Sequence, residues 1–414
     1  MAPTPFEFVP FGRRFARDPY AVYDRMREAG DLLRTPYGFY VAHRYADVRQ
    51  VHGDHHGFSM GALGASMGSM MAGGEPGADQ GGMGGGDFMM AQTMLTTDPP
   101  DHERLRRVVN RAFTPSSIAD LEPRIRAITR ELLAPLAAGD PFDIVADFAA
   151  PLPTIVIAEL LGIPAADGDK FRRWTEVVTG TDVRGSGADD AGGGGVRNRY
   201  GAELRAYLAE QIERRKTEPT DDLIGRMVVA NRDQVMTDAE VVASCILLLI
   251  AGNETTMRLI TNMTLALGRH PEQLERLVQD PDLIPSGVEE TLRYDSPVQM
   301  LFRGVKQPTR VGADEVPTGA SVLTMLAAAN RDPAAFPDAD VYDVGRTDNL
   351  HVSFGHGIHY CLGAPLARRE TRLAFEELLQ LAPRYEVLTP DDELEYPQMI
   401  FLRSPRSLVI KPAA

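Results

Sequence analysis

Cys361, one of only two cysteines in the chain, lies in a segment that can present a reactive sulfur atom. Gly355 and Gly357 precede it, and glycine adopts the backbone angles of a loop that doubles back tightly. The residues after Gly363 are typical of a helix, with Pro365 tolerated in its first turn. We therefore expect Cys361 near a helix N-terminus, where free N–H groups and the helix dipole stabilise a thiolate. Such a sulfur can bind a metal ion or the iron of a flat cofactor.

Two other interpretations of Cys361 stay open on the residues alone. A free cysteine is often a buried structural residue. Alternatively, His356, His359 and Cys361 supply three side chains of the kinds that bind zinc, although no fourth ligand is obvious nearby.

A second chemical pattern, at 251–256, falls inside a segment predicted to be helical from 237 to 269. Glycine and two adjacent threonines are locally unfavourable in the middle of a helix, which indicates a functional use. A threonine hydroxyl can bond the carbonyl one turn back and distort the helix. Glu254 and Thr255 place an acid beside an alcohol, although a buried helix can also carry both by chance.

Two polar pairs have the spacing of neighbours on one helix face. Glu290 and Arg293 are three residues apart, and His102 and Arg106 are four apart on a helix predicted to follow Pro100. The second pair can point at one anion, and arginine suits carboxylates because its donors form a planar fork. A surface salt bridge is the alternative for His102 and Arg106.

The scaffold that positions these residues is predicted to be mainly helical. Amphipathic periodicity predicts helices at 20–29, 118–138, 167–178, 200–216, 237–269 and 285–295. Short strand-like segments lie near 31–41, 309–311 and 321–325. The fold class is therefore mainly α with small β-sheets.

Composition excludes several classes of protein. A net charge of −15 argues against binding to nucleic acid, and two cysteines give no disulfide framework, which fits a reducing cytoplasm. The N-terminus lacks signal-peptide features, and the longest near-apolar run, 241–252, is shorter than the roughly 20 residues of a membrane span. Two arginine clusters contrast with the acidic total, and solvated helix faces are their plainest interpretation: Arg104, Arg106, Arg107 and Arg111, and then Arg368, Arg369 and Arg372.

Two segments have biased composition. The stretch 57–94 is rich in glycine and methionine, and a loop of this length is usually functional or disordered. Flexible thioethers suit a surface that repacks around apolar ligands, whereas copper(I) binding is a third interpretation. The stretch 185–195 ends in four consecutive glycines and separates two helical segments.

The segment 354–363 resembles the haem-ligand signature of the cytochrome P-450 superfamily, with Phe354, Gly355, Gly357, Cys361 and Gly363 at the expected positions. The resemblance implies that Cys361 is the axial thiolate ligand of haem b and that Phe354 shields the sulfur. It also implies one triangular-prism-like domain over 1–414, with haem between the long central helix and the helix after the cysteine loop.

The same resemblance gives roles to the other motifs. Glu254 and Thr255 match the acid–alcohol pair that relays protons to dioxygen, and Glu290, Arg293 and Arg346 look like the Glu-Arg-Arg triad. Val341 departs from a common pattern, because many relatives carry arginine there. The resemblance also implies residues that contact the haem. Those at its propionates are His102, Arg106, Arg303 and His359, and the others are Ala251 and Gly363.

The resemblance further implies a substrate pocket covered by a flexible methionine- and glycine-rich loop at 57–96, with a lid hinge at 183–197. Leu247 and Ile250 are candidate pocket residues because they fall one to two turns before Thr255 on the same predicted helix. The other candidates are Val298, Met300, Ile400, Phe401, Met89 and Met90, and chance core packing is the alternative for the first four.

The implied activity is that of a monooxygenase that hydroxylates or epoxidises an apolar small molecule with dioxygen. Electrons would come from NAD(P)H through a ferredoxin reductase and an acidic ferredoxin that docks near both arginine clusters, since no dinucleotide fingerprint is present. We expect a cytoplasmic monomer with no membrane or nucleic-acid partner. A peroxide-driven peroxygenase and a haem-binding sensor are the alternatives; the first usually lacks the acid–alcohol pair, and the second does not need Thr255.

Overall fold

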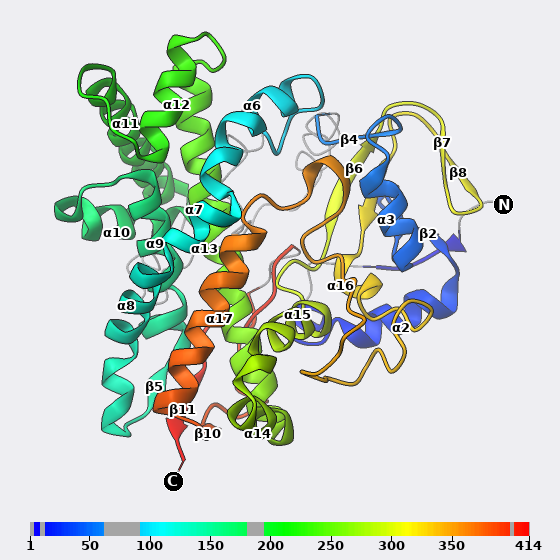
Figure 1. Ribbon diagram of the computed structural model, residues 1–414. Helices are drawn as coiled ribbons and strands as arrows, with labels where there is room; N and C mark the ends of the chain where they lie inside the picture. Colours follow the sequence, from blue (N-terminus) through cyan, green and yellow to red (C-terminus); the bar gives the residue numbers. More distant parts are fainter. Residues whose placement is uncertain (1–3, 9–12, 62–91, 180–193, 398–400, 414) are drawn as a thin grey trace. The chain divides into compact units, whose positions relative to one another are not determined.

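Figure 1 shows the computed structural model, which describes residues 4–8, 13–61, 92–179, 194–397 and 401–413. The expectations for Met89, Met90 and Ile400, for most of 57–96 and for 183–193 lie outside the described residues. The structure is 57% helical with small sheets, which confirms the predicted fold class.

The chain forms two compact units. The first contains Met1–Ala78, Asn262–Ala364 and Asp391–Arg406, and the second contains Asp79–Thr261, Pro365–Pro390 and Ser407–Ala414. The long helix α13, Asp238–Arg269, begins in the second unit and ends in the first.

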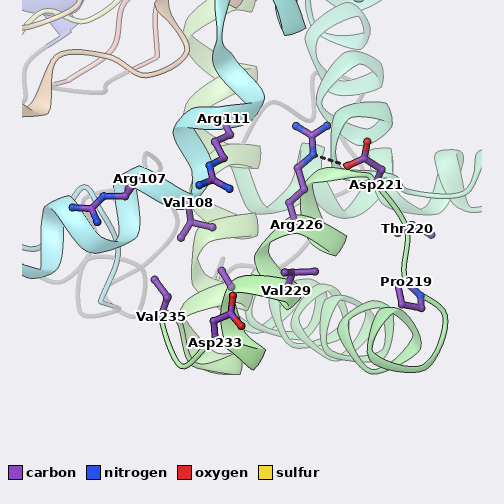
Figure 2. A pocket seen from close by; sticks show the side chains of 11 residues that line it. Arg107, Val108, Arg111, Pro219, Thr220, Asp221, Arg226, Val229, Asp233 and Val235 are labelled. Carbon is purple, nitrogen blue, oxygen red and sulfur yellow. Dashed lines mark hydrogen bonds and ion pairs between the residues drawn. The ribbon is translucent and has the colours of Figure 1, made fainter.

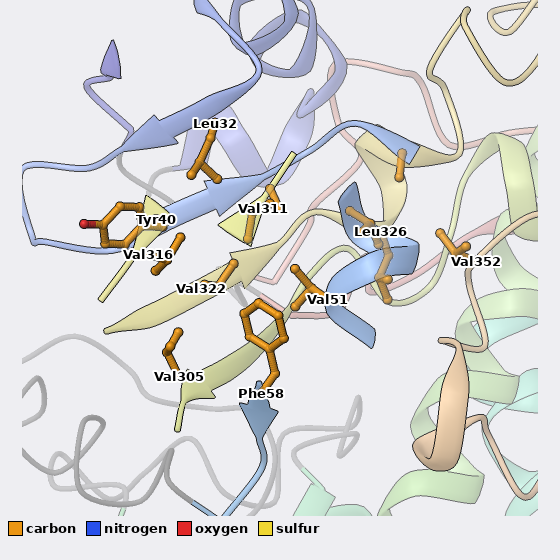
Figure 3. Close-up of a cluster of buried hydrophobic side chains, with 13 residues drawn as sticks. Leu32, Tyr40, Val51, Phe58, Val305, Val311, Val316, Val322, Leu326 and Val352 are labelled. Atoms are coloured by element: carbon orange, nitrogen blue, oxygen red, sulfur yellow. The ribbon is translucent and has the colours of Figure 1, made fainter. Parts of the chain in front are cut away.

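The first unit is built on a six-stranded sheet in the order β1-β2-β3-β9-β6-β4. Strand β3 pairs in parallel with β9, and β9 pairs antiparallel with β6, so that Arg303 lies opposite Val322. Figure 3 shows the apolar cluster on this sheet, where Val51 of helix α3 and Leu326 of helix α16 meet strand residues such as Val322. The strands are β1 (Thr4–Pro5), β2 (Leu32–Arg34), β3 (Tyr40–Ala42), β4 (Phe58–Ser59), β6 (Leu301–Val305) and β9 (Ser321–Thr324), with a separate pair β7 (Thr309–Val311) and β8 (Asp314–Val316).

The first unit also contains helices, of which α3 and α16 pack together. They are α1 (Arg13–Arg17), α2 (Tyr20–Ala29), α3 (Tyr45–Gly53), α14 (Pro271–Gln279), α15 (Ile284–Tyr294) and α16 (Leu326–Ala329), with 3-10 turns at Pro281–Leu283 and Gly357–His359.

The second unit is mostly helical. Helix α9 packs against α8 and α10, and α10 packs against α11 (Figure 1). The helices are α6 (Asp101–Asn110), α7 (Pro115–Asp120), α8 (Glu122–Leu133), α9 (Pro151–Leu161), α10 (Gly168–Thr179), α11 (Gly194–Thr217), α12 (Leu223–Arg232) and α17 (Ala364–Leu381), with 3-10 turns at Arg111–Phe113, Ala134–Ala138 and Ala165–Asp167 and a π-helix at Ile144–Ala149. A three-stranded sheet orders β10 (Tyr385–Val387), β11 (Val409–Pro412) and β5 (Phe142–Asp143).

Several predicted boundaries agree with these elements, and two predictions were wrong. The predicted helix at 20–29 matches α2. The predicted helix at 118–138 is instead α7, α8 and a 3-10 turn, because Pro123 and Pro135 lack the N–H that a continuous helix needs. The predicted strand at 31–41 is the hairpin of β2 and β3, with Gly38 at φ +86° in its turn.

Two helical stretches are long and apolar enough to cross a membrane by composition alone, Ile144–Leu161 and Asp238–Arg269. In both, 67% of the apolar window is buried inside the protein, as in the core helices of globular enzymes.

Candidate active site

The cysteine loop of the first unit closes on itself just before a helix. The Cys361 N–H donates to the Phe354 carbonyl at 2.9 Å, and the Tyr360 N–H donates to the Gly357 carbonyl at 3.0 Å. Gly355 and Gly357 have φ values of +74° and +73°, in the left-handed region that favours glycine. Helix α17 begins at Ala364, and Cys361 remains partly exposed. Cys361 therefore lies three residues before a helix N-terminus and is partly exposed, as the residue types predict.

The C-terminal end of α3 packs against this loop. A Cβ atom on Gly357 would overlap the His52 carbonyl oxygen, and one on Gly355 would lie 3.5 Å from His52 Nδ1. Helix α3 also contacts the turn Gly357–His359. Glycine at 357 is therefore required both by its backbone angle and by the approach of α3.

Cationic and imidazole side chains gather beside the loop in the first unit. Arg303 is 4% exposed, and its Nη2 lies 3.3 Å from His52 Nδ1. His52 Nε2 lies 2.9 Å from Thr324 Oγ1. Burial, the Arg303 guanidinium, and then His359 and His356 lower the pKa of His52 well below its ordinary value. His52 was missed by sequence reasoning, because a lone histidine before the glycine-rich loop carries no motif.

In the second unit, the middle of α13 has a short exposed face between buried residues such as Ile250 and Asn253. Ala251 is exposed, and Gly252 and Thr255 are partly exposed. The Thr255 hydroxyl donates to the Ala251 carbonyl at 2.7 Å, which is the bond one turn back expected from the sequence. Glu254 is buried, with Oε2 4.0 Å from Arg258 Nη2.

The other pair expected in the second unit lies on α6. His102 is buried at 2% exposure, and Arg106 is partly exposed on the same helix. Their four-residue spacing places them on one face of a continuous helix.

The structure joins Glu290, Arg293 and Arg346. Two Arg293 nitrogens donate to the two Glu290 oxygens at 2.8 Å each, and both side chains are 0% exposed. Arg346 Nε donates to the same carboxylate at 3.2 Å. Asn349 and the Asp343 N–H also bond Glu290, and the Val341 carbonyl accepts from Arg293.

The described pocket candidates fall into two groups. Leu247, Ile250 and Met300 are buried, whereas Val298 and Phe401 are partly exposed. Within the first unit, Val298 forms a β-bridge with Leu402, and the Gln299 N–H donates to the Phe401 carbonyl at 2.8 Å. The segments that carry Val298, Met300 and Phe401 are therefore adjacent.

Several arginines of the two clusters do not lie on solvated helix faces, as the sequence suggested, but bond nearby carboxylates. Arg369 and Arg372 on α17 both bond Glu122 of α8, and Arg372 also pairs with Glu376 at 3.2 Å. Arg104 pairs with Glu240 at 2.6 Å. These guanidinium groups are already neutralised by nearby carboxylates.

Arg107 and Arg111 keep a different environment on α6. Both are exposed, and neither has an ion pair with a described residue. They line a surface groove of about 590 Å³ together with residues that include Val229 and Val235. Figure 2 shows the side chains that line this groove. Arg226 also lines the groove and pairs with Asp221 at 3.0 Å.

The donor set fits a haem-thiolate better than zinc. Among the described residues, no group of three or more His, Cys, Asp or Glu side chains is arranged to hold a metal ion. A partly exposed cysteine just before a helix, with His359 in its loop and Arg303 nearby, would suit haem, whose iron takes a thiolate and whose propionates are anionic.

Comparison with known proteins agrees with this chemistry. The family model "Cytochrome P450" matches residues 197–412. The chain is 38% identical to Cytochrome P450 107B1 of Saccharopolyspora erythraea, over 99% of this chain and 98% of that protein. It is 39% identical to the Mycinamicin IV hydroxylase/epoxidase of Micromonospora griseorubida, over 91% of each. The crystal structure of myxobacterial cytochrome P450 CYP267B1 in complex with myristic acid aligns with a TM-score of 0.84 and 36% identity, over 98% of each chain. This chain therefore belongs to the cytochrome P450 superfamily of haem-dependent monooxygenases.

Proposed function

We propose that the protein uses haem b to insert one atom of dioxygen into an apolar small molecule, by hydroxylation or epoxidation. The observation that carries this proposal is the Cys361 loop, which is closed by the bond of the Cys361 N–H to the Phe354 carbonyl and leads directly into α17. When bound, a haem-thiolate iron supplies the binding and cleavage of dioxygen.

Haem needs a thiolate for its iron and hydrogen-bond donors for its propionates, and we assign both to residues of this chain. Cys361 would supply the thiolate that holds the iron, and Phe354 would shield the sulfur. His102, Arg106, Arg303 and His359 would hold the propionates: the planar guanidinium groups match carboxylates, and each imidazole can donate one N–H. Ala251 and Gly363 are small enough to let the porphyrin approach closely. The Glu290–Arg293–Arg346 triad fixes the segment before the cysteine loop rather than contacting the haem.

Protons are delivered by Thr255 and Glu254. The Thr255 hydroxyl rests on the Ala251 carbonyl, so a small rotation frees its proton for the reacting oxygen. Glu254, after taking up a proton itself, would return it to Thr255 Oγ1; its Oε2 lies 4.0 Å from Arg258 Nη2.

An apolar substrate is supported by the character of the candidate wall. Leu247, Ile250, Met300, Val298 and Phe401 offer carbon and sulfur surface only. A relative of this chain has been solved with myristic acid, and another is named a hydroxylase/epoxidase.

Electrons come from a ferredoxin that receives them from an NAD(P)H-dependent reductase. An acidic carrier is attracted to exposed arginines even though the whole chain has a charge of −15, since steering depends on local potential. Arg107 and Arg111 are the cationic groups of α6 best placed for this role. The enzyme works as a cytoplasmic monomer without a membrane or nucleic-acid partner.

The proposal is tested with Thr255→Ala and Cys361→His in the haem-loaded enzyme. Thr255→Ala should keep the reduced carbon-monoxide spectrum, while product formed per NAD(P)H falls by roughly tenfold or more, because proton delivery is lost. Unchanged coupling would remove Thr255 from proton delivery. Cys361→His should abolish the thiolate-type Soret band, and survival of that band would disprove the ligand assignment.

A further inference from the structure

We propose that His52, at the end of α3, is a positioning residue that holds the Arg303 guanidinium in place for a haem propionate. The inference rests on the proposed role of Arg303 as a propionate ligand. It adds His52, which lies outside the sequence motifs, and it specifies which tautomer of the imidazole holds Arg303.

The hydrogen bonds of His52 determine its tautomer. Arginine has donors only, so His52 Nδ1 must accept from Arg303 Nη2 at 3.3 Å. The ring proton is then on Nε2, which donates to Thr324 Oγ1 at 2.9 Å. The Thr324 hydroxyl donates in turn to the Leu301 carbonyl at 2.9 Å, so its oxygen is available as an acceptor. Every donor in this series of hydrogen bonds, from Arg303 to the Leu301 carbonyl, therefore meets an acceptor.

The surroundings also favour the neutral ring. His52 is 4% exposed, and the charged groups that face it are Arg303, His356 and His359. A protonated His52 would lose its Nδ1 acceptor and place a second buried cation beside Arg303. Burial and these neighbours accordingly lower the pKa of His52.

The chain of bonds is anchored in regular structure at both ends. Arg303 and Leu301 lie on β6, and Thr324 lies on the paired strand β9. Arg303 Nη1 also donates to the Phe302 carbonyl at 2.8 Å. Since the sheet fixes Thr324, the imidazole on α3 restricts the rotation of the arginine. Side-chain partners of this kind typically change the affinity for a bound metal group by roughly 10- to 100-fold when they are removed.

His52 has a second contact that an experiment must separate from the first. Its main-chain carbonyl abuts Gly357 of the cysteine loop, so a variant that moves the backbone would disturb the thiolate as well. Isosteric amides avoid this problem. Asparagine places an acceptor near Nδ1, whereas glutamine places a donor near Nε2 and leaves no acceptor for Arg303.

The test compares His52→Gln and His52→Asn in the full-length enzyme, with transfer of haem to excess apomyoglobin as the readout. His52→Gln should release haem roughly tenfold faster, and His52→Asn should stay near the wild-type rate. The exposed His56→Gln is the matched control and should show no change. Equal rates for the two His52 variants would overturn the proposal.

A double variant distinguishes positioning from packing. If His52 acts through Arg303, the effect of His52→Gln on haem release should vanish in an Arg303→Gln background. Independent, multiplied effects would show that His52 only packs the loop and would refute the inference. If Arg303→Gln alone leaves haem release unchanged, the propionate role of Arg303 in the proposed function fails first.

A spectroscopic readout covers the case in which a variant folds poorly. Nitrogen-15 NMR of histidine-labelled wild-type protein should show a neutral ring for His52 with the proton on Nε2, identified by the signal that His52→Asn removes. A doubly protonated ring, or a proton on Nδ1, contradicts the proposed hydrogen bond.

Discussion

Replacing Glu290 by glutamine tests the ion-pair network before the cysteine loop. The change keeps the volume of the side chain but removes its negative charge and one acceptor oxygen. In the wild-type protein that carboxylate accepts from Arg293, Arg346, Asn349 and the Asp343 N–H. The amide cannot satisfy all of these donors, so at least one buried bond to a guanidinium is lost.

The size of the effect follows from the burial of Arg293. The side chain is 0% exposed and also donates to the carbonyls of Asn330, Ala339 and Val341, which prevent it from turning toward water. Loss of one partner of a buried ion pair costs about 3–5 kcal/mol, because the other charge stays buried. Total stabilities of folded proteins are about 5–15 kcal/mol, so Glu290→Gln should remove a large fraction of the free energy of unfolding.

The assay is urea unfolding followed by far-ultraviolet circular dichroism, with the fluorescence of Trp174 as a separate report on the second unit. The control is Asp391→Asn, which breaks the exposed pair with Arg269 and should cost less than about 1 kcal/mol. If Glu290→Gln lowers the free energy of unfolding no more than Asp391→Asn does, the idea that the network contains buried charge is refuted.

Three further predictions use other parts of the structure. Burial raises the pKa of Glu370 from 4.5 to about 8, so the contribution of this carboxyl to stability is complete below pH 4.5 and is lost as the pH rises through 8. Glu370→Gln should therefore be more stable than the wild type at pH 8, by up to about 4 kcal/mol. The two proteins should differ little at pH 4.5, as measured by urea unfolding. Gly357→Ala should destabilise the protein far more than Gly38→Ala in thermal unfolding, because both positions have positive φ but only the first Cβ meets backbone atoms. Joint replacement of Arg107 and Arg111 by glutamate should lower the rate of association with an acidic ferredoxin at low salt and flatten its salt dependence, measured by stopped-flow reduction; an unchanged rate would move the docking surface elsewhere.

Sequence patterns predicted the elements whose cause is local. The bounds of α2 and the long α13 follow from the spacing of apolar residues, and the left-handed glycines of the cysteine loop follow from residue type. The threonine bond of Thr255 to the carbonyl of Ala251 has the same local origin. The break in 118–138 was also visible in Pro123 and Pro135, but the apolar periodicity on both sides concealed it.

Contacts between distant segments were not predictable from the sequence. Glu122 and Arg369 are 247 residues apart in the chain, and nothing in either segment indicates that they pair. His52 is 251 residues from Arg303, and its neutral ring is useful only because the β6–β9 ladder brings Thr324 and Arg303 to it. One sequence shows which side chains can bond but not which ones the fold brings together.

The pairing of α17 with α8 changes how the arginines of the chain should be interpreted. Arg369 and Arg372 follow the cysteine closely, and from the sequence they seemed as suitable for docking as the arginines of α6. Because Glu122 bonds both, their charges are balanced at short range, and an approaching acidic protein meets little net potential there. The exposed Arg107 and Arg111 have no such partner among the described residues. For an acidic partner, we therefore expect attraction to depend on exposed arginines such as Arg107 and Arg111, which have no ion pair with a described residue, rather than on the number of arginines near the thiolate.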